Sequence, residues 1–270
     1  MSRWEKAEHK LSLRERRYIT DQLTKEKRSE ELETMEEVFD KSTLMIVYRL
    51  LNSGALARIH GVVRAGKESR IYWAKGPDRK DVAVKIFLTS SAEFRKGMLT
   101  YIEGDPRFGR IRRDTRSLIY LWARKEYKNL SLCWRAKIKV PRPILVEGNV
   151  LLMQFIGRDG EPAPLLKETL LKDYQRFYGR LIDAISKLYT EANLVHGDLS
   201  EYNVMVSRKG PVLIDLSQAV HIEHPQASEF FLRDVTNVNR YFNRIVRLVP
   251  PEELLEKVKG EVGRNKPGRS

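Results

Sequence analysis

The feature that most constrains the fold of this chain is the stretch 194–203, in which four residues separate Asp198 from Asn203. Twelve residues after Asn203, an apolar run ends at Asp215. Apolar residues on either side of an Arg-Lys-Gly turn predict two short strands of a hairpin. Such a hairpin would bring the two aspartates and the asparagine to one end of the same structure.

Two carboxylates and an amide at one end of a hairpin suit the chemistry of phosphoryl transfer. One carboxylate orients the attacking group, while the amide and the other carboxylate hold Mg²⁺ against the phosphates. The spacing matches the catalytic loop and the metal-binding aspartate of protein kinases. The sequence therefore predicts that Asp198 is catalytic and that Asn203 and Asp215 are metal ligands. The alternative is a hairpin with ordinary surface carboxylates, and the ordered set of three argues against it.

The residues around this set resemble the RIO family of atypical protein kinases. The resemblance is carried by HGDLSEYN at 196–203 and IDLSQ at 214–218. It extends over about residues 43–248, and three more stretches, at 162–167, 224–225 and 234–239, look like the first RIO subfamily. The turn GKES at 66–69 is closer to the second subfamily, but no winged-helix pattern precedes it. The resemblance implies an α+β, two-lobed kinase fold with an antiparallel N-lobe sheet plus helix and a reduced helical C-lobe.

Several parts of an ordinary protein kinase are missing. Such kinases follow the metal-binding aspartate with Phe-Gly, an activation loop and then Ala-Pro-Glu. Here Leu-Ser follows Asp215, no Ala-Pro-Glu occurs, and 55 residues remain. That length is too short for the usual C-terminal substrate lobe. The departure bears on the phosphorylation of peptide substrates more than on ATP binding.

Residues 59–74 contain two apolar stretches on either side of a Gly-Lys turn. Gly61–Lys67 fits the first part of a Walker A motif, but Glu68 stands where a Mg²⁺-binding Ser or Thr belongs, and the next residues look like a strand. We therefore predict a strand-turn-strand lid over phosphates, with Lys67 in the turn and Ser69 and backbone amides near the phosphate oxygens. An ordinary hairpin is the alternative.

Lys85 lies inside the apolar run 82–87 and is predicted to be buried in a strand. Burying an ammonium group without an anionic partner is costly. The phosphates of ATP and a glutamate would supply that partner. We expect Glu126, on a helix over 117–132, to be this glutamate, although it follows Lys85 by 41 residues. RIO proteins resemble this chain in having an insertion here; an outward-facing lysine and an exposed helical glutamate are the alternatives.

Two apolar strands are predicted over 140–146 and 149–157, after an insertion at about 88–116 that we expect to be a long, partly flexible loop. The second strand would lead into the hinge between two lobes. The RIO resemblance implies that Gln154 and Ile156 contact adenine there and that Met153 lies at the back of the pocket. A plain transition from sheet to loop is the alternative.

Basic residues are concentrated between Arg107 and Arg142, where 12 Lys/Arg stand against two acids. Together with Trp122, Tyr127 and Trp134 they suit an RNA backbone with occasional base stacking. A solvated helix face with its aromatic residues in the core is the alternative. The net charge of +14 also favours a polyanionic partner, although solubility alone would account for it.

The sequence shows no sign of membrane insertion or secretion. No run of about 18 apolar residues occurs, and no apolar segment follows the N-terminus. Cys133 is the single cysteine, so it forms no disulfide within the chain. A cytoplasmic location is therefore expected.

Helical periodicity over 170–191 and 229–248 completes the expected C-lobe. We expect five regions in all. They are a charged extension at 1–41, the N-lobe at 42–152, the hinge at 153–156, the C-lobe at 157–256 and a polar, fraying tail at 257–270.

Together these features predict an ATP- and Mg²⁺-dependent atypical serine/threonine kinase or ATPase, with Mn²⁺ as an alternative metal. The resemblance further implies serine autophosphorylation, a second, catalytic role for Asp215 as an aspartyl phosphate, and maturation of the small ribosomal subunit through contact with its precursor rRNA. Two other functions stay open. One is a nucleotide-gated RNA-binding assembly factor with weak turnover, and the other is a small-molecule kinase of aminoglycoside type. The second would be expected to carry an acidic pocket, whereas this chain is basic.

Overall fold

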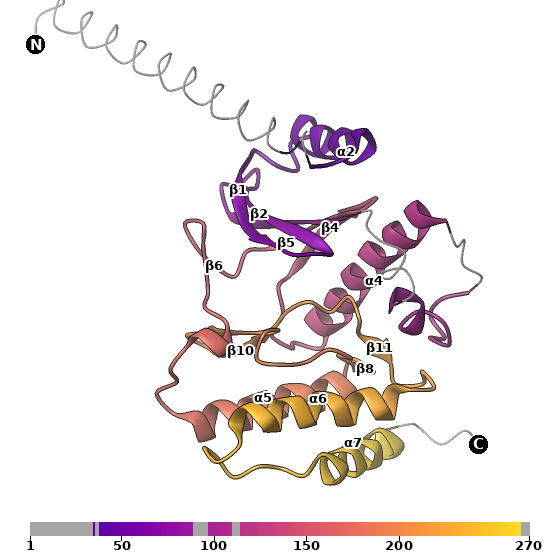
Figure 1. The fold of residues 1–270 in the computed structure, drawn as a ribbon, viewed down its shortest axis with the longest axis vertical. Helices are drawn as coiled ribbons and strands as arrows, with labels where there is room; N and C mark the ends of the chain where they lie inside the picture. The colour runs from indigo at the N-terminus through magenta and orange to yellow at the C-terminus, as the bar shows by residue number, and fades with distance from the viewer. Residues whose placement is uncertain (1–34, 36–37, 89–96, 110–113, 266–270) are drawn as a thin grey trace, which may run out of the picture.

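The structure is a computed structural model that describes residues 35, 38–88, 97–109 and 114–265. A sheet with one helix above it forms the upper lobe, and a group of helices forms the lower lobe (Figure 1). Helix α4 (Thr115–Arg135) lies beside the sheet and runs toward the lower lobe. The predicted two-lobed α+β architecture is confirmed.

The upper lobe is built on a five-stranded antiparallel sheet with the order β1-β2-β3-β5-β4. Its central strand is almost entirely buried because both faces of the sheet are covered. Val84 and Ile86 pack into the cluster beneath α2 (Lys41–Asn52), whereas Ala83 and Phe87 belong to the main core on the other face. The alternation places Lys85 on the face of Ala83. The strands are β1 (Arg58–Ala65), β2 (Ser69–Lys75), β3 (Asp81–Phe87), β4 (Pro143–Glu147) and β5 (Val150–Gln154).

Aspartate side chains fix the starts of helices α2 and α4. Asp40 accepts a hydrogen bond from the backbone N–H of Thr43 at the start of α2, and Asp114 accepts one from Ser117 at the start of α4. Such caps satisfy backbone donors that have no partner inside the helix. The helices predicted over 43–51 and 117–132 are confirmed, and each extends slightly beyond the predicted range.

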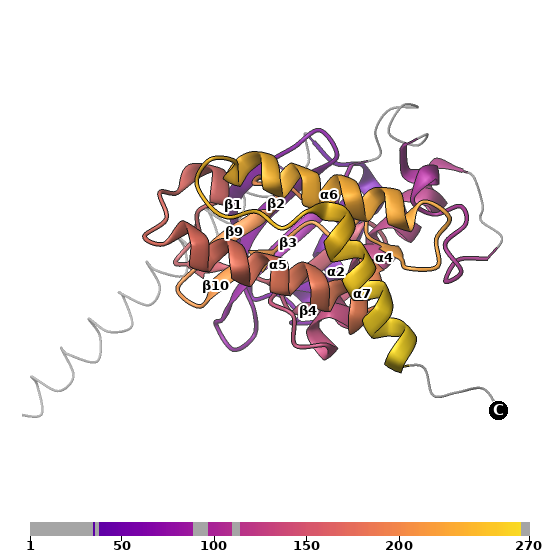
Figure 2. The same ribbon diagram turned by 90° about the horizontal axis from the view of Figure 1, so that it is seen from below.

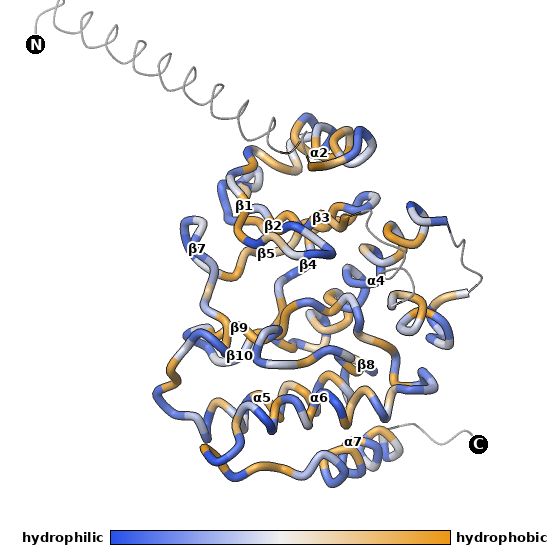
Figure 3. Tube along the Cα trace, viewed as in Figure 1, coloured by the Kyte–Doolittle hydropathy of each residue, from blue (hydrophilic) through white to orange (hydrophobic). Residues whose placement is uncertain are grey.

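The lower lobe rests on three helices, α5 (Tyr174–Thr190), α6 (Ala227–Phe242) and α7 (Pro251–Asn265), and α7 contacts both of the others (Figure 2). α5 and α6 alternate between polar and apolar residues, as expected of helices with one face in the core (Figure 3). Short elements carry the chain between the helices. They are β6 (Gly157–Arg158), β7 (Glu161–Pro162), the 3-10 helix η1 (Leu166–Glu168), β8 (Leu194–Val195), β9 (Val204–Ser207), β10 (Gly210–Leu213) and β11 (Val220–His221).

The insertion, for which we expected a long and partly flexible loop, is packed against the core in its described part. Residues 97–100 are helical, and Met98 and Ile102 are each 1 % exposed within the main core. Two apolar residues four apart are enough to attach one helical turn to the core, although few apolar residues surround them. Residues 89–96 and 110–113 lie outside the described residues.

The expected tail from residue 257 is also different, because Lys257–Asn265 continues helix α7. Leu254, Leu255 and Val258 are buried against the other helices and form a narrow apolar stripe. Residues 266–270 and most of the predicted charged extension lie outside the described residues, but Met35 and Phe39 are buried in the cluster beneath α2. Among the described helices, none is both long enough and apolar enough to cross a bilayer.

Both predicted C-lobe helices are shorter than their apolar patterns. α5 begins at Tyr174 because Asp173 caps it, and Leu170 before it is 91 % exposed. α6 ends at Phe242, since Asn243 has an extended backbone.

Candidate active site

The loop between β8 and β9 brings together the residues on which the sequence prediction rested. The Asn203 side-chain amide donates to the backbone oxygen of Asp198 at 2.8 Å and to its carboxylate at 3.2 Å. The backbone N–H of Ile214 donates to the backbone oxygen of Asn203 at 3.0 Å, so β10 delivers Asp215 to the same end of the hairpin. Asp198, Asn203 and Asp215 therefore lie together at one end of the hairpin, as the spacing predicts.

A buried aspartate on α6 holds this loop in position. Asp234 accepts hydrogen bonds from the backbone N–H groups of Gly197 at 2.7 Å and Leu199 at 2.8 Å. Burial raises the pKa of Asp234 to about 7, against the effect of these hydrogen bonds and of Arg233. Gly197 has a φ of 80°, and a Cβ there would lie 3.1 Å from the backbone oxygen of Gln218. No such role was predicted for Asp234, and its only signal in the sequence is the family resemblance of residues 234–239.

Lys85 forms the centre of the charged end of the site. Its ammonium lies 2.7 Å from Glu126 Oε2 and 3.0 Å from Asp215 Oδ1. Lys85 and Glu126 are 3 % and 1 % exposed, whereas the side chain of Asp215 is 44 % exposed. The predicted pairing of Glu126 with Lys85 is confirmed, so neither residue is an ordinary surface charge.

The two aspartates of the site differ in their electrostatic surroundings. Burial raises the pKa of Asp198, and the negative charge of Asp215 raises it further. Burial would also raise the pKa of Asp215, but the charge of Lys85 and hydrogen bonds from Lys85 and Ser217 lower it to about 2. For Lys85, burial lowers the pKa, but the carboxylates of Asp215 and Glu126 outweigh this and raise it. The more basic carboxylate of the pair is therefore Asp198.

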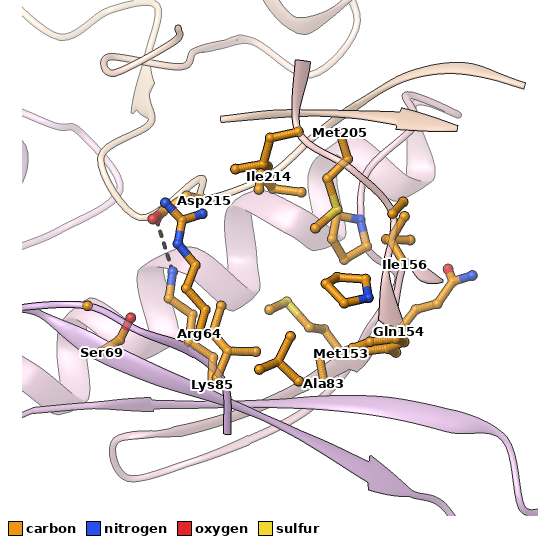
Figure 4. Close-up of a pocket in the computed structure, with 18 of the residues that line it drawn as sticks. Arg64, Ser69, Ala83, Lys85, Met153, Gln154, Ile156, Met205, Ile214 and Asp215 are labelled. Carbon is orange, nitrogen blue, oxygen red and sulfur yellow. Dashed lines mark hydrogen bonds and ion pairs between the residues drawn. The ribbon is translucent and has the colours of Figure 1, made fainter. Parts of the chain in front are cut away.

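A cavity of about 560 Å³ lies between the sheet and the lower lobe, within the range of small-molecule sites. Its charged end contains Lys67, Ser69, Lys85, Glu126 and Asp215. The opposite end contains all three predicted hinge residues, Met153, Gln154 and Ile156 (Figure 4). Asp198 and Asn203 are not among the lining residues.

Other lining residues were not predicted. The aliphatic and proline side chains of the cavity complete an apolar slot, and Ala83 could have been found because it lies two residues before Lys85 on the same strand face. These missed residues include Arg64, Ala83, Pro164, Leu165, Met205 and Ile214.

The prediction that the basic segment 107–142 contacts RNA is wrong for two of its cations, because their side chains point into the protein. Lys125 is buried and donates to the backbone oxygens of Ser217 at 2.8 Å and Ala219 at 2.6 Å. Arg107 forms an ion pair with Asp105 at 2.6 Å and donates to Asn129 at 2.7 Å. Trp122 is also in the core. A count of charges along the sequence does not distinguish these inward side chains from outward ones.

These inward side chains fasten the residues that follow Asp215. Asn129 donates to the backbone oxygens of Leu216 at 2.7 Å and Ala219 at 2.9 Å, next to the contacts of Lys125. The hydroxyl of Ser217 in turn donates to Asp215 at 2.8 Å. Helix α4 therefore holds the short segment that stands where other protein kinases have an activation loop.

The donor set fits Mg²⁺ held jointly with a substrate. Within the described ranges, no group of three or more His, Cys, Asp or Glu side chains is arranged to hold a metal. Magnesium often needs no such group, because one or two carboxylates, waters and substrate phosphates complete its coordination. Asp215 offers a carboxylate, and the hydrogen bonds from the Asn203 amide nitrogen fix the orientation of its side-chain oxygen.

Comparison with known proteins gives a consistent family. A family profile described as the RIO domain matches residues 70–254. The chain is 38% identical over 242 residues to the RIO-type serine/threonine-protein kinase Rio1 of Haloferax volcanii, covering 90% of this chain and 83% of that protein. It is 40% identical over 242 residues to Rio1 of Methanocaldococcus jannaschii, covering 89% and 81%. Human serine/threonine-protein kinase RIO1 is 38% identical over 228 residues. This match covers 83% of the present chain but only 40% of the human protein.

The fold is shared with a solved structure. The Rio2 kinase–ADP/Mg²⁺–phosphoaspartate complex from Chaetomium thermophilum matches with a TM-score of 0.64 and 22% identity, covering 84% of this chain and 68% of that one. The resemblance inferred from the motifs is therefore confirmed over most of the chain. This chain belongs to the RIO family of serine/threonine protein kinases.

Proposed function

We propose that this chain binds ATP with Mg²⁺ in the cavity between the lobes and transfers or hydrolyses the γ-phosphate. The observation that carries the proposal is Lys85, which is buried and ion-paired with both Glu126 and Asp215 at the charged end of that cavity. Such a lysine, fixed beside a metal-binding carboxylate, is what phosphate positioning requires. The adenine would occupy the apolar end, near Gln154 and Ile156.

The residues of the site then divide the work of the reaction. Lys85 positions the phosphates, while Asn203 and Asp215 hold Mg²⁺ or Mn²⁺. When bound, the metal neutralises charge on the phosphates. Asp198, with its raised pKa, orients or deprotonates the attacking hydroxyl or water. Serine autophosphorylation would follow if that hydroxyl belonged to this chain.

The solved complex of Rio2 kinase from Chaetomium thermophilum contains ADP, Mg²⁺ and a phosphoaspartate. In the present chain, Asp215 is the residue proposed to form a phosphoaspartate. In that step an Asp215 oxygen attacks the γ-phosphorus, the bond to the bridging oxygen breaks, and ADP leaves with the electron pair. Water would then hydrolyse the acyl phosphate. The 44 % exposure of the Asp215 side chain supports this access.

Replacing Lys85 by alanine is expected to lower ATP turnover at least about 10-fold, because a charge-assisted contact to phosphate is lost. Turnover would be measured with γ-labelled ATP, together with a thermal melt that checks folding. Removing Lys85 also leaves Glu126 buried without its partner, so Lys85→Met combined with Glu126→Gln serves as the folded control. If both folded variants turn over ATP at the wild-type rate, Lys85 has no role with phosphate.

We propose further that the chain acts in the cytoplasm on the precursor of the small ribosomal subunit and contacts its rRNA. The exposed cations of α4 support an RNA contact, since Arg124, Lys128 and Arg135 lie outward at helical spacing, and Trp134 is 47 % exposed beside them. This surface replaces the whole segment 107–142 as the proposed contact. The proposed lobes remain 42–152 and 157–256, with α7 extending the second to Asn265.

Reversing the charges of Arg124, Lys128 and Arg135 to glutamate is expected to weaken RNA binding and flatten its salt dependence. Each lost phosphate contact removes about 0.7 to 0.9 from the slope of log affinity against log salt. ATP turnover without RNA should persist. The matched control reverses Lys257, Lys259 and Arg264 on α7, which changes the net charge equally. Equal salt slopes for the two triple variants would assign the basic excess to solubility.

A further inference from the structure

Strand β1 contains two irregularities, and each changes which face of the sheet the following side chains occupy. Ile59 pairs with Ala74, Val62 with Tyr72 and Arg64 with Ile71. β1 therefore gains one residue relative to β2 before Val62 and another after it. Directly paired residues in antiparallel strands share a face, and adjacent residues of one strand occupy opposite faces. Val62 therefore shares the face of Tyr72 beneath α2, whereas Arg64 shares the face of Ile71. After the two shifts, Arg64 lies on the face of the sheet opposite to Ile59.

The face that Arg64 occupies is the cavity face. Ile71 pairs in turn with Lys85 on β3, so Arg64 and Lys85 belong to one row across the sheet, two strands apart. Two strand spacings are roughly 10 Å between backbones, which long side chains readily bridge. Arg64 lines the cavity, and Figure 4 shows its side chain extending beside that of Lys85 toward Asp215.

The carboxylates at the charged end of the cavity outnumber the charge that Lys85 can supply, so binding of a phosphate group there requires further cations. The ammonium of Lys85 is already shared between two carboxylates, and Glu68 adds another carboxylate to the lining. Within the part of the chain that the structure describes, Arg64 forms no ion pair with any of them. A polyphosphate entering this end meets Lys85, whose charge is shared with two carboxylates, Lys67 in the turn of the lid, and Arg64 on the face of the sheet. The planar fork of a guanidinium matches phosphate oxygens and can bind two of them at once.

We propose that Arg64 binds the terminal phosphates of ATP and makes the cavity selective for the triphosphate. This inference rests on the proposed function, because it takes the cavity to be the ATP site. Lys85 fixes the phosphate nearer to the sheet, and Arg64 reaches from the lid to the phosphate nearer to Asp215. The lid therefore contributes a side chain to nucleotide binding in addition to its turn at Gly66 and Lys67.

Replacing Arg64 by alanine should raise the dissociation constant of ATP about 10-fold or more, as expected for a lost charge-assisted contact. The increase should be smaller for ADP, and the affinity for adenosine should not change. Arg64→Lys should recover part of the ATP affinity, since it restores charge but not the fork. Affinities would be measured by calorimetry on the full chain, with a thermal melt of each variant. Arg240→Ala, an exposed arginine of α6, is the control for charge and should bind ATP like the wild type.

Two results would overturn the proposal. The first is wild-type ATP affinity in Arg64→Ala, whether or not turnover falls. The second is an equal loss of affinity for ATP and adenosine, which would mean that the substitution distorts the lid. Failure of the proposed function is distinguishable, because the wild-type chain itself would then bind no ATP.

Discussion

Asp198→Asn is expected to lower the rate of ATP turnover by about 10²- to 10⁴-fold, the range for loss of a general base. Asparagine keeps the shape of the side chain and can still accept a hydrogen bond from the Asn203 amide, now 3.2 Å from the carboxylate. It cannot accept a proton from the attacking group. Binding of Mg-ATP should stay close to wild type, because Asn203 and Asp215 still hold the metal and Lys85 still meets the phosphates.

The measurement pairs a turnover assay with calorimetric titration of Mg-ATP. Asp183→Asn is the matched control, since Asp183 is an exposed aspartate on α5 and its loss should alter neither quantity. A variant at Asp198 that keeps the wild-type rate would remove this residue from the reaction. A variant that binds no Mg-ATP would assign Asp198 to metal binding instead.

Asp215→Asn is expected to weaken Mg-ATP binding as well as turnover, because Asp215 is a proposed metal ligand and also contacts other residues of the site. It accepts hydrogen bonds from Lys85 at 3.0 Å and from Ser217 at 2.8 Å. We expect the Mg²⁺ concentration for half-maximal activity to rise at least about 10-fold and turnover to fall at least about 10²-fold. Asparagine is preferred to alanine here because the φ of Asp215 is 59°, a left-handed conformation that asparagine adopts more readily than alanine.

The same position tests the proposed acyl phosphate. An aspartyl phosphate is labile to hydroxylamine, whereas phosphoserine is not. Enzyme trapped during turnover of γ-labelled ATP should therefore carry hydroxylamine-sensitive label in the wild type and none in Asp215→Asn. Label that resists hydroxylamine entirely would favour direct transfer to a hydroxyl group or to water.

The parts of the site that depend on local chain order were predictable. Asp198, Asn203 and Asp215 fall within 18 residues around one hairpin, and the turn between its strands fixes their proximity. The pairing of Lys85 with Glu126 spans 41 residues, so its prediction came from the order of parts in a known family rather than from local geometry.

Other features depend on packing that the sequence pattern does not specify. Arg64 faces the cavity through its pairing with Ile71, which follows two register shifts in β1, and the sequence pattern shows neither shift. Lys125 looked like part of a basic surface, yet it lies in the core because backbone oxygens at 217 and 219 satisfy its ammonium. Burial lowers its pKa, and the charge of Arg107 lowers it further. A lysine in such a place depends on partners far away in the sequence.

The burial of apolar residues in helix α7 and in the insertion could not be predicted from the sequence pattern either. Leu254, Leu255 and Val258 are too few for a strong periodic pattern, and they become core residues because α5 and α6 offer a surface to cover. Met98 and Ile102 do the same for the insertion. Short apolar stripes therefore acquire structure from their neighbours rather than from their own propensity.

The most direct test of the account is to measure Mg-ATP affinity and turnover side by side in Asp198→Asn and Asp215→Asn. Two different outcomes are expected: Asp198→Asn binds Mg-ATP like the wild type but turns it over about 10²- to 10⁴-fold more slowly, and Asp215→Asn loses affinity together with turnover. If both variants lose affinity equally, or if both keep wild-type turnover, these carboxylates do not divide the tasks of phosphoryl transfer as proposed.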